Sequence, residues 1–103
     1  MSRSILNALG MPATKYGHWY LEYAIQISRV DRTLLLSVTK RLYPQIAEHF
    51  HTSPQSVEHS IRYCIRQSWE VGNRPLFHEI AGRQLSCCPY ASEFIAMLAD
   101  YDP

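Results

Sequence analysis

Apolar residues recur at intervals of three and four along most of the chain, with polar positions between them. This spacing is typical of amphipathic helices that bury one face. It predicts six helices: Ser4–Leu9, His18–Val30, Arg32–Thr39, Leu42–Phe50, Pro54–Trp69 and Ser92–Asp100. No segment alternates strongly enough to predict a strand, although Gly82–Cys87 is compatible with a short extended piece. We therefore predict an all-α fold.

Several residues mark where these helices start and stop. Gly10 is placed to end the first helix, and Gly72 to end the fifth. Asp31 is a good N-cap for the third helix, because its carboxylate can accept a hydrogen bond from a free backbone amide. Thr52 and Gln55 have the spacing of a capping box, which predicts the start of the fifth helix.

The buried faces follow from the same spacing. In the second helix we expect Tyr20 or Leu21, Ala24, Ile27 or Ser28, and Val30 near one stripe. The fifth helix is expected to bury Val57, Ile61, Cys64, Ile65 and Trp69, and the sixth Phe94, Ile95 and Leu98. The aromatic residues Tyr16, Trp19, Tyr20 and Tyr23 cluster in one helix, which favours a role in packing over a role as a binding platform.

The composition is that of one folded domain. The chain has 103 residues, of which 47% are hydrophobic and 18% charged, so we interpret residues 1–103 as a single globular domain. The longest aliphatic run, Leu34–Leu36, is too short to span a bilayer. The N-terminus lacks the zones of a signal peptide. We therefore expect a cytoplasmic protein without a membrane partner.

The charge is small and unevenly distributed. The net charge is +1, but residues 1–74 carry nine Lys or Arg against five Asp or Glu, whereas residues 75–103 carry one against four. A basic front and an acidic tail would suit a DNA-facing surface and a solvated far side, although an ordinary mixed surface explains the charges equally well. The three cysteines, Cys64, Cys87 and Cys88, form a poor disulfide framework, so we expect free and mostly buried thiols.

The segment from Ile46 to Arg62 is the most informative for function. One helix presents Ile46 and Ala47, a short polar turn follows, and a second helix buries Val57 and Ile61. This is the spacing of a helix-turn-helix over about residues 43–69, in which the second helix would lie in the major groove. A plain helical hairpin can have the same pattern.

If the second helix faces DNA, its outward side chains are the candidate contacts. Ser56, Glu58, His59 and Tyr63 are the candidates for base edges, and Arg62 and Arg66 for phosphate or guanine. The turn at Thr52 and Ser53 can donate backbone hydrogen bonds to phosphate.

The chain resembles the C-terminal effector domain of the sporulation-initiation response regulator family of spore-forming bacteria. The resemblance covers about Ile5 to Asp100, and two unusual strings carry it most strongly: Ser37-Val38-Thr39-Lys40-Arg41-Leu42-Tyr43-Pro44 and Ser92-Glu93-Phe94-Ile95-Ala96-Met97. It implies a six-helix bundle whose fourth and fifth helices form the helix-turn-helix. It also implies a transcription regulator that binds a short box in double-stranded DNA, forms a dimer on tandem sites and contacts RNA polymerase, with no cofactor. The family's receiver domain is absent from these residues, so the chain is either an excised domain or stands alone.

Some positions depart from the family pattern. Glu58 and Arg62 match recognition-helix positions that face DNA in the family, but Ser56 and His59 stand where the family has arginines, and Tyr63 stands where it has histidine. Glu48-His49 occupies a site that is usually Lys-Lys. Loss of two arginines removes guanine contacts worth about 1–3 kcal/mol each. The chain therefore reads another DNA sequence, binds DNA weakly, or keeps the fold for another purpose.

Three alternatives to DNA binding are an enzyme, a metal site and a protein-interaction module. The string His78-Glu79-Ile80-Ala81-Gly82 begins like a zinc-protease helix, but Gly82 stands where the second histidine is required, so we predict neither a catalytic site nor an enzyme. His49, His51, His59 and Cys64 do not have a spacing that chelates a metal easily, so we predict no metal site. A protein-interaction module that no longer binds DNA tightly is the main alternative.

Overall fold

The computed structural model describes residues 2–12 and 14–101 of the chain, and within these ranges the structure is all-α, with no strand. Six α-helices are present: α1 (Ser2–Ala8), α2 (Tyr16–Val30), α3 (Tyr43–Phe50), α4 (Pro54–Val71), α5 (Arg74–Ala81) and α6 (Ala91–Asp100). A 3-10 helix, η1 (Arg32–Leu36), and a π-helical turn, η2 (Val38–Leu42), lie between α2 and α3. The predicted fold class is therefore confirmed.

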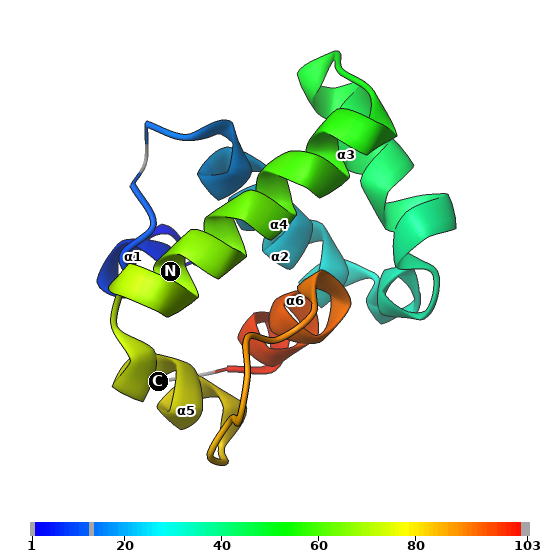
Figure 1. The fold of residues 1–103 in the computed structure, drawn as a ribbon. Coiled ribbons are helices and arrows are strands. Elements are labelled where there is room, and N and C mark those ends of the chain that lie inside the picture. The colour runs from blue at the N-terminus through cyan, green and yellow to red at the C-terminus, as the bar shows by residue number, and fades with distance from the viewer. Residues whose placement is uncertain (1, 13, 102–103) are drawn as a thin grey trace.

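Helix α2 is the central element, because it packs against α1, α3, α4, α6 and η1. In Figure 1, α4 crosses the front of the molecule, with α2 behind it and α6 below. The side chains that α2 buries cover a wide face: His18, Tyr20, Leu21, Ala24, Ile25 and Ser28. Val30, which was expected near the buried stripe, is 90% exposed because it is the last residue of the helix and points away from every neighbour in the core.

The segment after α2 differs from the prediction of one helix over Arg32–Thr39. Asp31 does act as an N-cap, since its side chain accepts a hydrogen bond from the Thr33 amide at 3.1 Å, but the helix that follows is a short 3-10 helix. Three consecutive leucines cannot all face one core from a single helix. Leu34 is buried, whereas Leu36 is 85% exposed.

Helix α5 was not predicted from the sequence, where Gly72 served only as the end of the preceding helix. The Asn73 side chain caps this helix by accepting a hydrogen bond from the Leu76 amide at 3.2 Å. Gly82 ends it in the left-handed conformation, with φ of 73°. The suggested extended piece over Gly82–Cys87 is wrong, because these residues form bends and irregular loop that lead to α6.

Two expectations about burial also need correction. Among the aromatic residues of α2, Tyr20 is buried against Phe50, at 5.0 Å between ring centroids, but Tyr16 is 70% exposed and Trp19 is 49% exposed. Both lie on the side of the first turns that faces solvent, whereas Gly17 and His18 in the same turns are buried. Of the three free thiols, Cys64 is buried, Cys88 is half-buried and Cys87 is exposed on the loop before α6.

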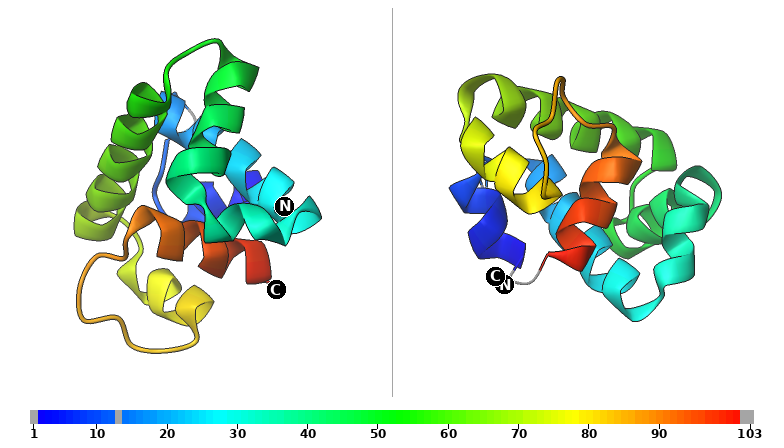
Figure 2. Two further views of the ribbon diagram at one scale, coloured as in Figure 1. Left: turned by 90° about the vertical axis from the view of Figure 1, so that its right-hand side faces the viewer. Right: turned by 90° about the horizontal axis from the view of Figure 1, so that it is seen from below.

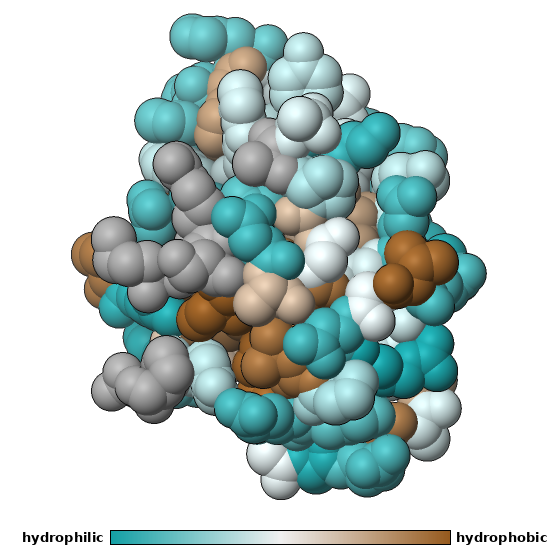
Figure 3. Space-filling view, turned by 90° about the vertical axis from the view of Figure 1, so that its left-hand side faces the viewer, coloured by the Kyte–Doolittle hydropathy of each residue, from teal (hydrophilic) through white to brown (hydrophobic). Residues whose placement is uncertain are grey.

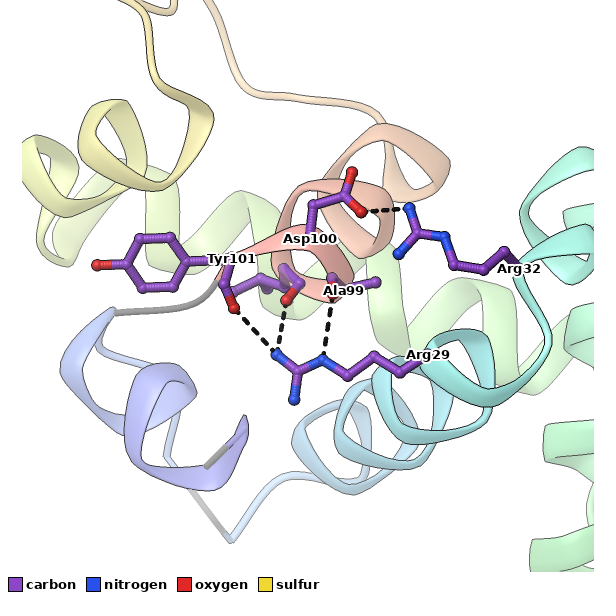
Figure 4. A network of polar contacts seen from close by, with 6 residues as sticks. Arg29, Arg32, Ala99, Asp100 and Tyr101 are labelled. Carbon is purple, nitrogen blue, oxygen red and sulfur yellow. Dashed lines mark hydrogen bonds and ion pairs between the residues drawn. The ribbon is translucent and has the colours of Figure 1, made fainter.

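The C-terminal end of α6 is held by arginines from the region where α2 ends. Arg29 donates to the backbone carbonyls of Leu98, Ala99 and Tyr101, and Arg32 forms an ion pair with Asp100 (Figure 4). The last carbonyls of a helix have no partner within it, so an arginine at this position stabilises the helix end. These contacts fix the position of α6 against α2.

The surface shows no broad apolar band on the face drawn in Figure 3, where a small hydrophobic area is bordered by hydrophilic residues. The large hydrophobic residues that are exposed are scattered over several elements: Tyr16, Trp19, Val30, Leu36, Tyr63, Val71 and Tyr90. None of the described helices has the length and apolar character needed to cross a membrane.

Candidate nucleic-acid interface

Helices α3 and α4 are joined by residues 51–53, in a turn whose geometry is set by hydrogen bonds (Figure 2). His51 ends α3 in the left-handed conformation, with φ of 57°. The Thr52 amide then donates to the Ala47 carbonyl at 2.9 Å. This bond uses the Thr52 amide within the protein, so it is not available to a phosphate as the sequence analysis had expected.

The N-cap of α4 is Ser53, not Thr52. The Ser53 side chain accepts a hydrogen bond from the Ser56 amide at 3.1 Å, and its hydroxyl also lies 3.0 Å from the Ser56 hydroxyl. The predicted capping box of Thr52 and Gln55 is therefore wrong by one residue at its start. Pro54, in the first turn, needs no amide partner there and is compatible with this start.

The inner face of α4 is buried as predicted. Val57, Ile61, Cys64, Ile65 and Trp69 are all at most 8% exposed. Burial raises the pKa of the Cys64 thiol, so this group stays protonated and behaves as a small apolar side chain.

Gly17 brings the backbone of α2 close to α4. A Cβ atom at Gly17 would lie 2.5 Å from the Cys64 sulfur and would also collide with the Ser60 carbonyl. Ala47, a small residue of α3, is also buried. Position 17 therefore determines how near α4 lies to the central helix.

The outer face of α4 carries the predicted contact residues, and the structure divides them into two groups. His59 and Tyr63 border a shallow hollow of about 270 Å³, together with Lys15 and Tyr16 from the start of α2. His59 is exposed, and Tyr63 is 52% exposed. Ser56 is also exposed, near the N-terminus of α4, with its amide bonded to Ser53.

The second group is Glu58, Arg62 and Arg66. These residues line one side of a groove of about 580 Å³, which we call the α4–α6 groove. Its other sides are formed by residues 35, 36, 38 and 39, by Tyr43, and by residues 88–92 in the loop before α6 and its first turn. Glu58 and Arg62 form an ion pair at 3.8 Å across one turn of α4. Because both side chains are well exposed, this pair adds little to stability and leaves Arg62 free to exchange partners.

Tyr43 connects the groove to the core. The residue is 4% exposed, yet it lines the groove. Desolvation and the nearby negative charge of Glu58 raise the pKa of Tyr43 to about 12, against the opposing effect of Arg62. The hydroxyl is therefore a neutral hydrogen-bond donor over the whole physiological pH range.

The residues that approach α4 from other elements were not predicted from the sequence: Lys15, Thr39, Tyr43 and Ser92. They come from the start of α2, from the π-helical turn, from the first residue of α3 and from the first turn of α6. Periodicity reports only which side of its own helix a residue occupies, so it gave no sign that these residues meet beside α4.

Two of the histidines, His49 and His78, have structural contacts. The His78 Nδ1 accepts a hydrogen bond from the Leu85 amide at 2.9 Å, which holds the loop after α5 against that helix. His49 stacks on Tyr23, with 4.0 Å between ring centroids. Within residues 2–12 and 14–101, no three His, Cys, Asp or Glu side chains gather in a way that could hold a metal ion.

The structure has the features of a small DNA-binding domain. Helices α3 and α4 are joined by a tight turn, and the outer face of α4 is polar and partly basic. Comparison with known families agrees with this class. Residues 2–101 match the family model described as "Sporulation initiation factor Spo0A C terminal". The chain belongs to this family, which consists of DNA-binding effector domains of a sporulation regulator.

Proposed function

We propose that the domain is a sequence-specific transcription regulator that inserts α4 into the major groove of double-stranded DNA, with α3 and the turn at residues 51–53 completing a helix-turn-helix. The observation that carries this proposal is the division of α4 into a fully buried face and a face of exposed polar side chains. Membership of the family supports DNA as the partner.

The proposed base-reading residues are Ser56, Glu58, His59 and Tyr63, all on the outer face near the start or middle of α4. Arg62 and Arg66 would contact phosphate or guanine. Ser53 would lie beside a phosphate through its position in the turn, whereas the Thr52 amide is already bonded to Ala47. These residues differ from the family pattern at three positions, so we propose an altered DNA site.

The resemblance extends the proposal in three respects. Two copies would bind tandem sites, the bound domain would contact RNA polymerase, and the protein would act in the cytoplasm, where bacterial DNA lies. We propose no catalytic activity and no cofactor, in keeping with the non-enzymatic character of the family.

The direct test is fluorescence anisotropy with two duplexes, one carrying the sporulation-type box and one scrambled, at about 50 and 200 mM salt. Tighter binding to the box would show that the family specificity survives the changes at positions 56 and 59. Equal, salt-sensitive binding to both would indicate a different site, to be found by selection from random sequences. No binding at either salt concentration would contradict the proposal.

A second candidate function is a protein-interaction module that has kept the fold. The observation that favours it is the exposure of Tyr16, Trp19 and Tyr63, of which Tyr16 and Tyr63 border the same hollow. Exposed aromatic side chains are enriched in protein interfaces. Loss of all DNA binding together with retained folding would favour this function.

A further inference from the structure

The α4–α6 groove collects hydrogen-bond donors from elements that lie far apart in the sequence. Arg62 and Arg66 come from α4, Tyr43 from α3 and Ser92 from α6. The walls between them are partly apolar and include Leu35 and Pro89. The groove opens beside the outer face of α4, so a DNA strand that borders that face would run past it.

The N-terminus of α6 forms one end of this groove. The helix starts at Ala91, and its N-cap, Tyr90, makes no side-chain capping hydrogen bond. The first hydrogen bond of the helix is donated by the Phe94 amide to the Tyr90 carbonyl at 2.8 Å. The amides before Phe94 therefore lack acceptors within the helix and favour an anion at this end. Ser92 adds an exposed hydroxyl in the same turn.

The Tyr43 hydroxyl points independently to a ligand. Only 4% of Tyr43 is exposed, its hydroxyl is not among the fully buried polar atoms, and that hydroxyl forms no hydrogen bond with any residue that the structure describes. A phenol hydroxyl can donate one hydrogen bond, and here it has no acceptor within the protein. Because Tyr43 lines the groove, the partner that its hydroxyl lacks would lie within the groove.

The charges around the groove favour an anion at the α6 end. Arg66 is exposed and forms no ion pair within the described part of the chain. The two nearby carboxylates are balanced by arginines, since Glu93 pairs with Arg83 at 2.7 Å and Glu58 pairs with Arg62 at 3.8 Å. Arginine, serine and tyrosine side chains and helix N-termini are the groups that bind DNA phosphates.

We propose that the α4–α6 groove binds a short stretch of sugar–phosphate backbone, with one phosphate at the N-terminus of α6 beside Ser92 and Arg66 and a neighbouring one near Tyr43. The apolar walls would contact deoxyribose. This inference rests on the proposed function, and it adds a contact surface outside the recognition helix. Inorganic phosphate in solution offers the same groups as a DNA phosphate, so the test uses DNA and inorganic phosphate separately.

The test follows the backbone amide resonances of the domain by NMR while a duplex of the selected sequence is added. Shifts at Ala91–Glu93 together with shifts along the outer face of α4 are the expected result. Shifts in α4 without shifts at Ala91–Glu93 would overturn the inference and leave the proposed function intact. If no amide in α4 moves with any duplex, the proposed function fails.

A parallel titration uses inorganic phosphate against chloride at constant ionic strength. Shifts at Ala91–Glu93 with both DNA and millimolar phosphate would show that the site takes free phosphate as well, whereas shifts there with phosphate alone would mean that it binds only the free ion and would overturn the inference. No shift with phosphate together with no shift with DNA would overturn the inference.

Two variants test the energetics. Ser92→Asp places a negative charge at a helix N-terminus, where it favours folding but repels phosphate, so we expect about tenfold weaker DNA binding with an unchanged or higher melting temperature. Gln26→Glu makes the same charge change on an exposed part of α2 away from the groove and is the matched control. Tyr43→Phe should weaken binding by about threefold to tenfold, because only the hydroxyl is lost. Unchanged affinity in both Ser92→Asp and Tyr43→Phe would contradict the proposal.

Discussion

Arg29, one residue before the end of α2, donates a hydrogen bond from its Nη2 to the carbonyl oxygen of Leu98 in α6, at 2.9 Å. The same guanidinium donates from its Nε to the Ala99 carbonyl at 3.2 Å. The C-terminus of α6 is thus fixed on the central helix, and its N-terminus is thereby held beside α4.

Replacement of this guanidinium should loosen α6. We expect Arg29→Ala to lower the free energy of unfolding by about 1–2 kcal/mol, because charge-assisted hydrogen bonds to otherwise unpaired carbonyls are lost. Arg29→Lys keeps the charge but not the two-pronged geometry and should fall between the variant and the wild type. Urea denaturation measures all three proteins. A stability of Arg29→Ala equal to that of the wild type would show that the contacts contribute nothing.

Gly17 and Gly82 should respond to alanine for different reasons. At Gly17 the added Cβ would collide with the Ser60 carbonyl and the Cys64 sulfur, so α2 and α4 must separate, at a cost of about 1–3 kcal/mol or more. At Gly82 the space is open, and only the left-handed backbone opposes the change, which costs about 1–2 kcal/mol. Gly17→Ala should therefore also weaken DNA binding, measured by anisotropy, whereas Gly82→Ala should not. Equal effects of both variants on binding would contradict this explanation.

Arg62→Ala should lose at least about 1 kcal/mol of DNA-binding free energy without a lower melting temperature, because it removes a charged contact from a solvated face. The ion pair with Glu58 is too exposed to change this expectation for stability. Arg32→Ala is the charge-matched control, since Arg32 lies near the end of α6 and pairs with Asp100. Anisotropy on both variants gives the comparison, and an unchanged affinity for Arg62→Ala would remove Arg62 from the interface.

Ile61→Ala should cost roughly 2–4 kcal/mol of stability, because the residue is fully buried between α4 and the core and its truncation leaves a cavity. Chemical denaturation measures the loss. Tyr63→Ala, two residues along on the exposed face, should cost much less and is the matched control. A small effect at Ile61 would mean that α4 does not depend on this face for its position.

Tyr43 should make the fold sensitive to alkaline pH. Folding raises the pKa of Tyr43 from 10.0 to about 12, so the native state favours the neutral phenol. This contribution to stability is complete below pH 10 and is lost as the pH rises from about 10 to 12. Thermal unfolding at a series of pH values should therefore show a smaller alkaline decline for Tyr43→Phe than for the wild type. Identical declines would show that the phenol titrates normally.

Helices that bury one regularly spaced apolar face were predictable from the sequence. Helices marked mainly by the residues that cap their ends were harder to predict. The buried set of α4, from Val57 to Trp69, follows directly from apolar spacing. Helix α5 is short, and the capping role of Asn73 was hidden in a string that also looked like a loop. The 3-10 and π turns after Asp31 arise because three adjacent leucines and Ser37 cannot continue one helical face.

The candidate site was predictable only on α4 itself. Periodicity identified Ser56, Glu58, His59, Arg62, Tyr63 and Arg66 as outward, and all six lie on the outer part of the helix. It could not reveal that Tyr43 and Ser92 reach the same groove as Arg66, because this meeting depends on how α3 and α6 pack on α2. The exact start of α4 also escaped it, because Thr52 and Ser53 are both good capping residues.

The close seating of α4 on Gly17 has an evolutionary consequence. Since the inner face alone fixes the helix on α2, the outer side chains can be exchanged one at a time without disturbing the core. A lineage can then pass from one DNA site to another through intermediates that all fold. The resemblance implies that the serine, histidine and tyrosine at positions 56, 59 and 63 are changes of this kind, made on a scaffold that did not have to be rebuilt.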